Sequence, residues 1–134
     1  MNNTLALIKP DAMQKGFKDK IRKDIMENGF VIVEEKTLNL SIEQAEGFYA
    51  IHKDKPFFGE LVEFMTSNET HIMKLEKENA VVEWRDLMGA TNPAEAESGT
   101  IRAKYGTDIS MNATHGSDSN ENAEIEINFF FKDL

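Results

Sequence analysis

The chain has 134 residues, of which 40% are apolar, and this composition predicts one folded domain over residues 1–134. Cysteine is absent, which excludes disulfides and thiol chemistry, and no apolar run approaches the roughly 18–20 residues that cross a bilayer. The formal net charge of −9 argues against nucleic acid and membranes as partners, so an anionic ligand would need a local cluster of cations.

The first half of the chain alternates between strand and helix patterns. Residues 4–8, TLALI, form a short apolar run typical of a strand, and the N-terminus lacks a basic segment before it, so we expect no signal peptide and a cytoplasmic location. Residues 16–28 carry the apolar stripe of a helix, followed by a capping glycine. Residues 30–40 are β-branched and predict a strand, and SIEQ opens a helix over 41–51 with a capping box.

The second half continues this alternation. The patterns predict a helix over 57–67, a strand over 70–77, a helix over 79–89, a loop over 91–99, a short helix over 100–106, a weak strand over 108–115 and a last helix from Ser117. The last helix should turn Ala123, Ile127, Phe130 and Phe131 inward. Strands separated by helices indicate an α+β sandwich, in which helices pack on an antiparallel sheet.

The strongest candidate for chemistry is His115, within NATHGSDSNENAEIE. An imidazole is a good nucleophile near neutral pH, provided that an acceptor holds its other ring nitrogen, and Glu126 on the following helix is placed to do so. The N-terminus of that helix, at Ser117 and Asp118, offers N–H groups suited to a phosphate. The alternative is a loop histidine bonded to its own backbone. The chain has neither of the common glycine-rich nucleotide motifs, no zinc pattern and no serine-nucleophile motif.

Other isolated residues suit a nucleotide. Lys9, Arg85 and Arg102 could hold phosphates, although each is also consistent with an ordinary surface charge. Phe57 and Phe58 cannot share one helix face, so one of them could be exposed and stack on a base, or both could anchor the core. Trp84 is expected to lie in the core. His52 and His71 are expected to be either structural or exposed to solvent.

Four segments in this order resemble the nucleoside diphosphate kinase family: TLALIKPDA, GFYAIHKDKPFFGELVEFMTS, WRDLMGATNPAEAESGTIRAKYG and NATHGSDSNENAEIEINFFF. The resemblance covers nearly the whole chain, and HGSDS is its most specific part. It implies a ferredoxin-like α+β fold with a four-stranded antiparallel sheet and helices over one face. It also implies transfer of the γ-phosphoryl group of a nucleoside triphosphate, typically ATP, to a nucleoside diphosphate. The mechanism implied is ping-pong, through a phosphohistidine at His115.

The same resemblance gives catalytic roles to residues around His115. Lys9 would contact the transferring phosphoryl group and the ribose hydroxyl, with Tyr49 beside it. Ser117 and Glu126 would orient the histidine.

For the nucleotide, the resemblance implies a base stacked on Phe57 near Leu61. Asn112 would contact the ribose, and Gly116 would let the backbone pass close to the ligand. The phosphates would be clamped by Arg85, Thr91 and Arg102.

The resemblance further implies Mg²⁺ on the phosphates, reached through water by Asp118. The expected partners are nucleoside tri- and diphosphates and further copies of the chain, in a tetramer or hexamer built from dimers, with Pro93 at a contact. Two positions depart from the family pattern. Ser110-Met111 stands where Gly-Arg is common, and Lys55 stands where arginine is common.

Two rival functions belong to other classes. A phosphohistidine relay would pass the phosphoryl group from His115 to a protein, but it would need no base-stacking Phe57. A catalytically silent interaction module would not need an intact His115, Lys9, Asn112 and Glu126.

Overall fold

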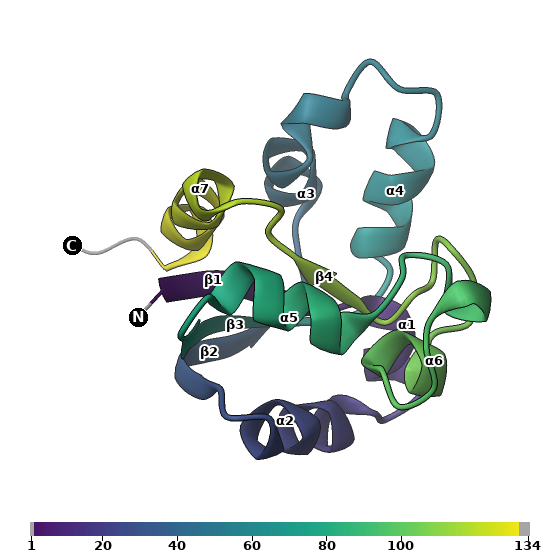
Figure 1. The fold of residues 1–134 in the computed structure, drawn as a ribbon. Helices are drawn as coiled ribbons and strands as arrows, with labels where there is room; N and C mark the ends of the chain where they lie inside the picture. The colour runs from purple at the N-terminus through teal and green to yellow at the C-terminus, as the bar shows by residue number, and fades with distance from the viewer. Residues whose placement is uncertain (1, 132–134) are drawn as a thin grey trace.

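The computed structural model describes residues 2–131, and for Ile51 it describes the backbone alone. Its strands are β1 (Asn2–Ile8), β2 (Val31–Leu38), β3 (Thr70–Lys77) and β4 (Thr114–Gly116). Its α-helices are α1 (Pro10–Gln14), α2 (Lys18–Glu27), α3 (Ile42–Phe48), α4 (Phe58–Met65), α5 (Ala80–Met88), α6 (Ile101–Tyr105) and α7 (Asn120–Phe130). Two short 3₁₀ helices complete the set, η1 (Ala50–His52) and η2 (Pro93–Glu95). Figure 1 shows their arrangement.

The four strands form one antiparallel sheet in the order β2-β3-β1-β4. The expected ferredoxin-like α+β fold is therefore confirmed. The central strand β1 pairs with β3 along its whole length, and with β4 through Leu7 opposite His115. His115 is thus attached directly to the most buried strand of the sheet.

Helices cover both faces of the sheet, so the expectation of helices over one face is wrong (Figure 1). On one face, Leu5 and Leu7 pack with residues of α3, α4 and α7. On the other face, Ala6 and Ile8 pack with residues of α1, α2, α5 and α6. Successive side chains of a strand point to opposite faces, so the unbroken apolar run of β1 is buried from both sides.

Several local predictions are confirmed. The strand over 70–77 has the expected bounds, and the capping box forms, with the Ser41 hydroxyl accepting from Gln44 N–H at 3.0 Å and the Gln44 side chain accepting from Ser41 N–H at 2.9 Å. Trp84 is fully buried, and the inward face of α7 packs into the first core. His71 is buried and bonded to its neighbours, which makes it structural.

Three elements differ from the expectations. Helix α1 was not predicted, because five residues carry no apolar period, although Pro10 occupies the first turn that proline favours. The weak strand shrinks to Thr114–Gly116, since the Asp108 carboxylate accepts from the N–H groups of Ser110 and Met111 and closes a turn. Helix α7 begins at Asn120, because Ser119 is its N-cap.

Among residues 2–131, none of the helices combines the length and the apolar composition that a membrane span requires.

Candidate active site

Two cavities meet at His115. The first, of about 600 Å³, lies between α4, Lys9 and the loop before β4, and we call it the Phe57 cavity. The second, of about 620 Å³, lies between α5, the loop that follows it and β4, and we call it the Arg85 cavity. Both are lined by Thr91, Arg102 and His115, so a long ligand could lie along them and pass the imidazole.

Most of the expected site residues border these cavities. The Phe57 cavity has in its wall Lys9, Phe57, Leu61, Thr91, Arg102, Asn112 and His115. The Arg85 cavity has Arg85, Thr91, Arg102, His115 and Gly116. Four expected residues line neither cavity: Tyr49, Ser117, Asp118 and Glu126. Tyr49, Ser117 and Glu126 contact or neighbour the His115 side chain and so support it from behind.

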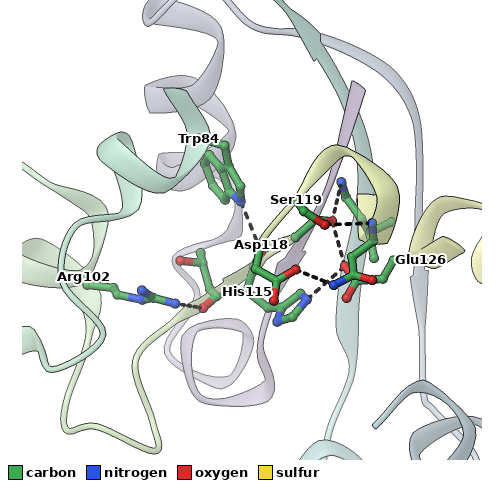
Figure 2. A network of polar contacts seen from close by, with 10 residues as sticks. Trp84, Arg102, His115, Asp118, Ser119 and Glu126 are labelled. Atoms are coloured by element: carbon green, nitrogen blue, oxygen red, sulfur yellow. Dashed lines mark hydrogen bonds and ion pairs between the residues drawn. The ribbon is translucent and has the colours of Figure 1, made fainter. Parts of the chain in front are cut away.

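The His115 ring is held through one nitrogen (Figure 2). Its Nε2 lies 3.3 Å from Oε1 of Glu126, and the same carboxylate oxygen accepts from the Ser117 hydroxyl at 2.7 Å. The Ser117 hydroxyl in turn accepts from the backbone N–H of Leu5 at 3.4 Å. A carboxylate is an acceptor, so Nε2 carries the proton and Nδ1 keeps its lone pair. Nδ1 forms no hydrogen bond with the described residues.

Aromatic rings fix the plane of the imidazole. Phe48 meets it edge-on with ring centroids 5.3 Å apart, and Tyr49 does so at 6.2 Å. The Tyr49 hydroxyl is buried without a hydrogen-bond partner in the described chain, and burial, followed by the nearby Glu126 charge, raises the pKa of the phenol. A neutral hydroxyl beside the imidazole can donate to a ligand that reaches it.

The backbone of His115 is fixed from α5. Trp84 Nε1 donates to the His115 carbonyl at 3.2 Å (Figure 2). A Cβ on Gly116 would come within 2.5 Å of Trp84 Cδ1 and 2.6 Å of Met88 Cε. Gly116 is therefore required by close packing against α5, a reason that the sequence did not reveal.

Three cations surround the imidazole without carboxylate partners. Among residues 2–131, Lys9, Arg85 and Arg102 take part in no salt bridge. Arg102 donates to the carbonyls of Gly89 at 3.1 Å and Thr114 at 2.9 Å. Burial, followed by the repulsion from Arg85, lowers the pKa of Arg102 to about 10, which leaves it charged at neutral pH. In a protein of net charge −9 these cations make a local site for an anion.

Lys9 is held by neutral oxygens. Its ammonium donates to Oδ1 of Asn112 at 3.0 Å and to the Ser110 carbonyl at 3.4 Å. The Asn112 amide nitrogen donates to the carbonyls of Thr91 and Ile109. Burial is the main cause that lowers the pKa of Lys9 to about 8; nearby Arg102 also lowers it, and Asp11 and Asp108 oppose the shift.

An apolar wall also borders the Phe57 cavity, and the Lys9 ammonium lies 5.9 Å from the centre of its Phe64 ring. Phe57 is 47% exposed, whereas its neighbour Phe58 packs against the core, so of the two alternatives left open the structure shows one exposed phenylalanine. Leu61 and Phe64 extend the wall along α4. No role was expected for Phe64. His52, which was expected to be structural or exposed, also lines the cavity, with its ring 5.9 Å from that of Phe57.

The expected phosphate site at Ser117 and Asp118 is not a helix terminus. Ser117 is fully buried, and α7 starts after its cap at Ser119. Asp118 is exposed and accepts from Asn122 at 2.5 Å (Figure 2). No group of three or more His, Asp or Glu side chains within residues 2–131 is arranged to hold a metal ion. A divalent ion would therefore need ligands from the phosphates of a bound nucleotide.

Within residues 2–131, a histidine with one unbonded ring nitrogen lies beside cations that form no salt bridge and beside an apolar wall, an arrangement that suits a phosphotransferase. The geometry suits a ligand with phosphates at one end and a flat ring at the other.

Comparisons with known proteins give the family. A family model described as nucleoside diphosphate kinase matches residues 2–134. A nucleoside diphosphate kinase of Campylobacter jejuni is 57% identical over 132 residues, covering 98% of this chain and 96% of its own. The structure of the Aquifex aeolicus nucleoside diphosphate kinase superposes with a TM-score of 0.96 at 42% identity, covering 98% of this chain and 95% of that one. A halophilic nucleoside diphosphate kinase from Halobacterium salinarum, solved in complex with CDP, gives a TM-score of 0.94 at 40% identity, with 98% and 88% covered.

The chain therefore belongs to the nucleoside diphosphate kinase family. It is an enzyme that transfers the γ-phosphoryl group of a nucleoside triphosphate to a nucleoside diphosphate, through a phosphohistidine and two half-reactions. Its substrates are nucleotides, and the family generally requires a divalent metal and assembles into oligomers.

Proposed function

We propose that His115 is the histidine that carries the phosphoryl group, and that Nδ1 is the attacking atom. The observation that supports this most directly is the hydrogen-bond pattern of the ring. The Glu126 carboxylate accepts a hydrogen bond from Nε2, and the Ser117 hydroxyl orients that carboxylate. The proton of the neutral ring is therefore on Nε2, and the lone pair is on Nδ1. The role does not depend on general acid–base help, because phosphoryl transfer needs positioning and charge stabilisation above all.

The reaction balances as two displacements. In the first, Nδ1 attacks the γ-phosphorus, an N–P bond forms, and the bond to the bridging oxygen breaks. The electron pair of that bond stays on the departing nucleoside diphosphate. In the second, the terminal phosphate oxygen of another nucleoside diphosphate attacks the phosphohistidine, and the N–P electrons return to Nδ1.

The three cations would stabilise the charge on the phosphates during both steps. We assign the clamp to Arg85, Arg102 and Thr91, and contacts with the transferring group and the ribose to Lys9. The Tyr49 hydroxyl, which is buried and has no partner in residues 2–131, would assist from its place beside the imidazole. Asn112 would contact the ribose from its place between Lys9 and Thr91. Gly116 would form part of the cavity wall next to the phosphates.

The base would stack on the exposed face of Phe57, with Leu61 beside it. Stacking accepts any base, because every base has a π-face, so we expect broad specificity with ATP as the usual donor. The CDP complex of the Halobacterium salinarum relative supports a nucleoside diphosphate as ligand here.

We further propose Mg²⁺ as the divalent ion. Its preference for oxygen ligands and retained water fits a site that has no cluster of carboxylates within the described residues, with Asp118 reaching it through water. When bound, the ion would neutralise phosphate charge; Lys9, Arg85 and Arg102 would supply the remaining positive charge.

The other properties follow from the family and the composition. We propose one nucleoside diphosphate kinase domain over residues 1–134, a cytoplasmic location, and a homo-oligomer, tetramer or hexamer, built from dimers. Pro93, packed against Gly106 in the loop after α5, is our candidate for a subunit contact. The net charge of −9 argues against nucleic acid and membranes as partners.

The test is a two-step transfer in which each of the three histidines is varied in turn. The protein is mixed with γ-labelled ATP and Mg²⁺, freed of nucleotide, and examined for acid-labile, base-stable label. Addition of GDP should move the label to GTP. His115→Ala should take up no label, whereas His52→Ala and His71→Gln should still be labelled. Label retained by His115→Ala would contradict the assignment, and label that cannot pass to GDP would favour a relay to a protein.

A further inference from the structure

A second buried carboxylate lies beside the site, and the reaction described above gives it no task. Asp11, in the first turn of α1, is only 5% exposed. Its Oδ2 accepts a hydrogen bond from the backbone N–H of Ala113 at 3.1 Å, across 102 positions of sequence. A buried carboxylate costs free energy unless its contacts compensate, so this contact calls for an explanation.

The contact falls on a strained residue. Ala113 has a φ of +75°, a conformation that residues with a Cβ rarely adopt. The N–H of Thr114 donates to the carbonyl of Asn112 at 2.9 Å, which closes a three-residue turn around Ala113. A turn of this kind with positive φ is rare and strained, and it persists only where its surroundings hold it.

The segment 9–11 holds the turn on both sides. The N–H of Lys9 donates to the Ala113 carbonyl at 2.8 Å, while Asp11 accepts from the Ala113 N–H. Asn112, directly before the strained residue, accepts from the Lys9 ammonium, and His115 follows two positions after it. If Ala113 relaxed to an ordinary conformation, Asn112 and His115 would turn relative to each other and to Lys9.

We propose that Asp11 is a positioning residue for phosphoryl transfer: its carboxylate holds Ala113 in the left-handed turn and thereby fixes His115 relative to Lys9 and Asn112. The inference rests on the proposed role of His115. It differs from a purely electrostatic role, in which the charge of Asp11 would act on the neighbouring ammonium of Lys9. The two roles make opposite predictions for variants that separate the acceptor from the charge.

Three variants make this separation, and a fourth is the control. Asp11→Asn removes the charge and keeps an oxygen acceptor, whereas Asp11→Ala removes both. Ala113→Gly removes the strain, since glycine adopts positive φ readily, and it is combined with Asp11→Ala in the double variant. Asp19→Asn removes the same charge from an exposed position of α2 and is the matched control. For each protein, single-turnover labelling by γ-labelled ATP at saturating nucleotide and thermal unfolding are measured.

We expect Asp11→Ala to slow labelling roughly 5- to 150-fold, the factor that corresponds to the cost of one strained backbone residue. Asp11→Asn should retain most of the rate that Asp11→Ala loses, and Ala113→Gly should recover most of it in the double variant. The asparagine and glycine results are read beside the unfolding temperatures, because relief of strain by glycine also raises stability. The informative result is recovery of the labelling rate at a temperature where all the variants are folded.

Three results would overturn the inference. The first is a wild-type rate for Asp11→Ala. The second is an Asp11→Asn rate as low as that of Asp11→Ala with no recovery in the double variant, which would assign the effect to charge. The third is failure of both proteins with Ala at position 11 to fold, which would make Asp11 a determinant of the fold. An unlabelled wild type and unlabelled Asp19→Asn would instead overturn the role of His115, and this inference with it.

Discussion

The charge of Lys9 should set the alkaline limit of substrate capture. Burial lowers the pKa of Lys9 to about 8, well below that of an exposed lysine. The ammonium is held by an amide oxygen and a carbonyl, and these neutral groups do not restore the lost solvation fully. If the neutral amine binds phosphate poorly, kcat/KM for ATP should fall above pH 8 with the loss of one proton.

The size of this effect follows from the titration. At about pH 9 roughly one molecule in eleven keeps the proton, so kcat/KM should drop to about a tenth of its plateau. A bound phosphate raises the pKa of a neighbouring lysine, so kcat should bend at a higher pH than kcat/KM.

The stability of the fold should change with pH in the opposite direction to kcat/KM. The folded pKa of about 8 lies below the unfolded value of 10.5, so the unfolded chain binds more protons between these values and stability rises with pH there.

The Lys9 pKa changes from 10.5 in the unfolded chain to about 8 in the folded one. At about 1.36 kcal/mol per pKa unit, this lowers the free energy of unfolding by about 3 kcal/mol below pH 8, and the loss is relieved as the pH rises. The assay is initial-rate kinetics between about pH 6 and pH 10, with urea unfolding of the wild type and Lys9→Met at each pH. Lys9→Arg stays charged and should lose the bend in kcat/KM. A wild-type kcat/KM that is flat to about pH 9.5, or a bend that survives in Lys9→Arg, would refute the reasoning.

Three further changes should separate folding from catalysis. Gly116→Ala should lower the free energy of unfolding by about 1–3 kcal/mol in urea titrations, because the new methyl group would overlap Trp84; equal stability would contradict the packing. Phe57→Ala should raise KM about 5- to 150-fold for ATP, GTP and CTP alike, with kcat little changed; a loss confined to one base would argue against simple stacking. Ser117→Ala should slow phosphorylation and reduce stability by about 1–3 kcal/mol, because it removes a hydrogen bond from the Glu126 carboxylate; an unchanged Tm and rate would contradict the orienting role.

The patterns that predicted the fold correctly were local ones. The alternation and apolar content of residues 70–77 and the SIEQ box depend on neighbours a few positions away, and both appear as expected in β3 and α3. The errors arose where local signals competed. Ser117 and Ser119 are equally plausible caps for the last helix, and the burial of Ser117 beneath His115, which leaves Ser119 as the cap, is decided by tertiary contacts.

The site was less accessible to such reasoning, because its contacts join distant positions. Lys9 meets Asn112 across 103 residues, and no periodicity predicts this pair; the resemblance to a family gave each residue a role at the ribose but did not predict the contact between them. Asp11 escaped attention although it stands beside Lys9 in KPD, because its partner is a backbone N–H with no signature in the sequence. Phe64 could have been found, since it shares the helix face of Phe57 and Leu61.

Lys9 and Arg102 rest on amide and carbonyl oxygens rather than on carboxylates, and this has a consequence for turnover. A ping-pong enzyme must empty and refill its nucleotide site in the middle of every cycle. A cation paired with a carboxylate would have to break that pair for each arriving phosphate and form it again at each departure. Here the neutral oxygens keep both side chains in place, and within residues 2–131 neither side chain has a salt bridge to break, so the reorganisation energy of each half-reaction is kept small. The Lys9 and Arg102 side chains therefore have the same arrangement when the second nucleotide binds as when the first nucleoside diphosphate departs.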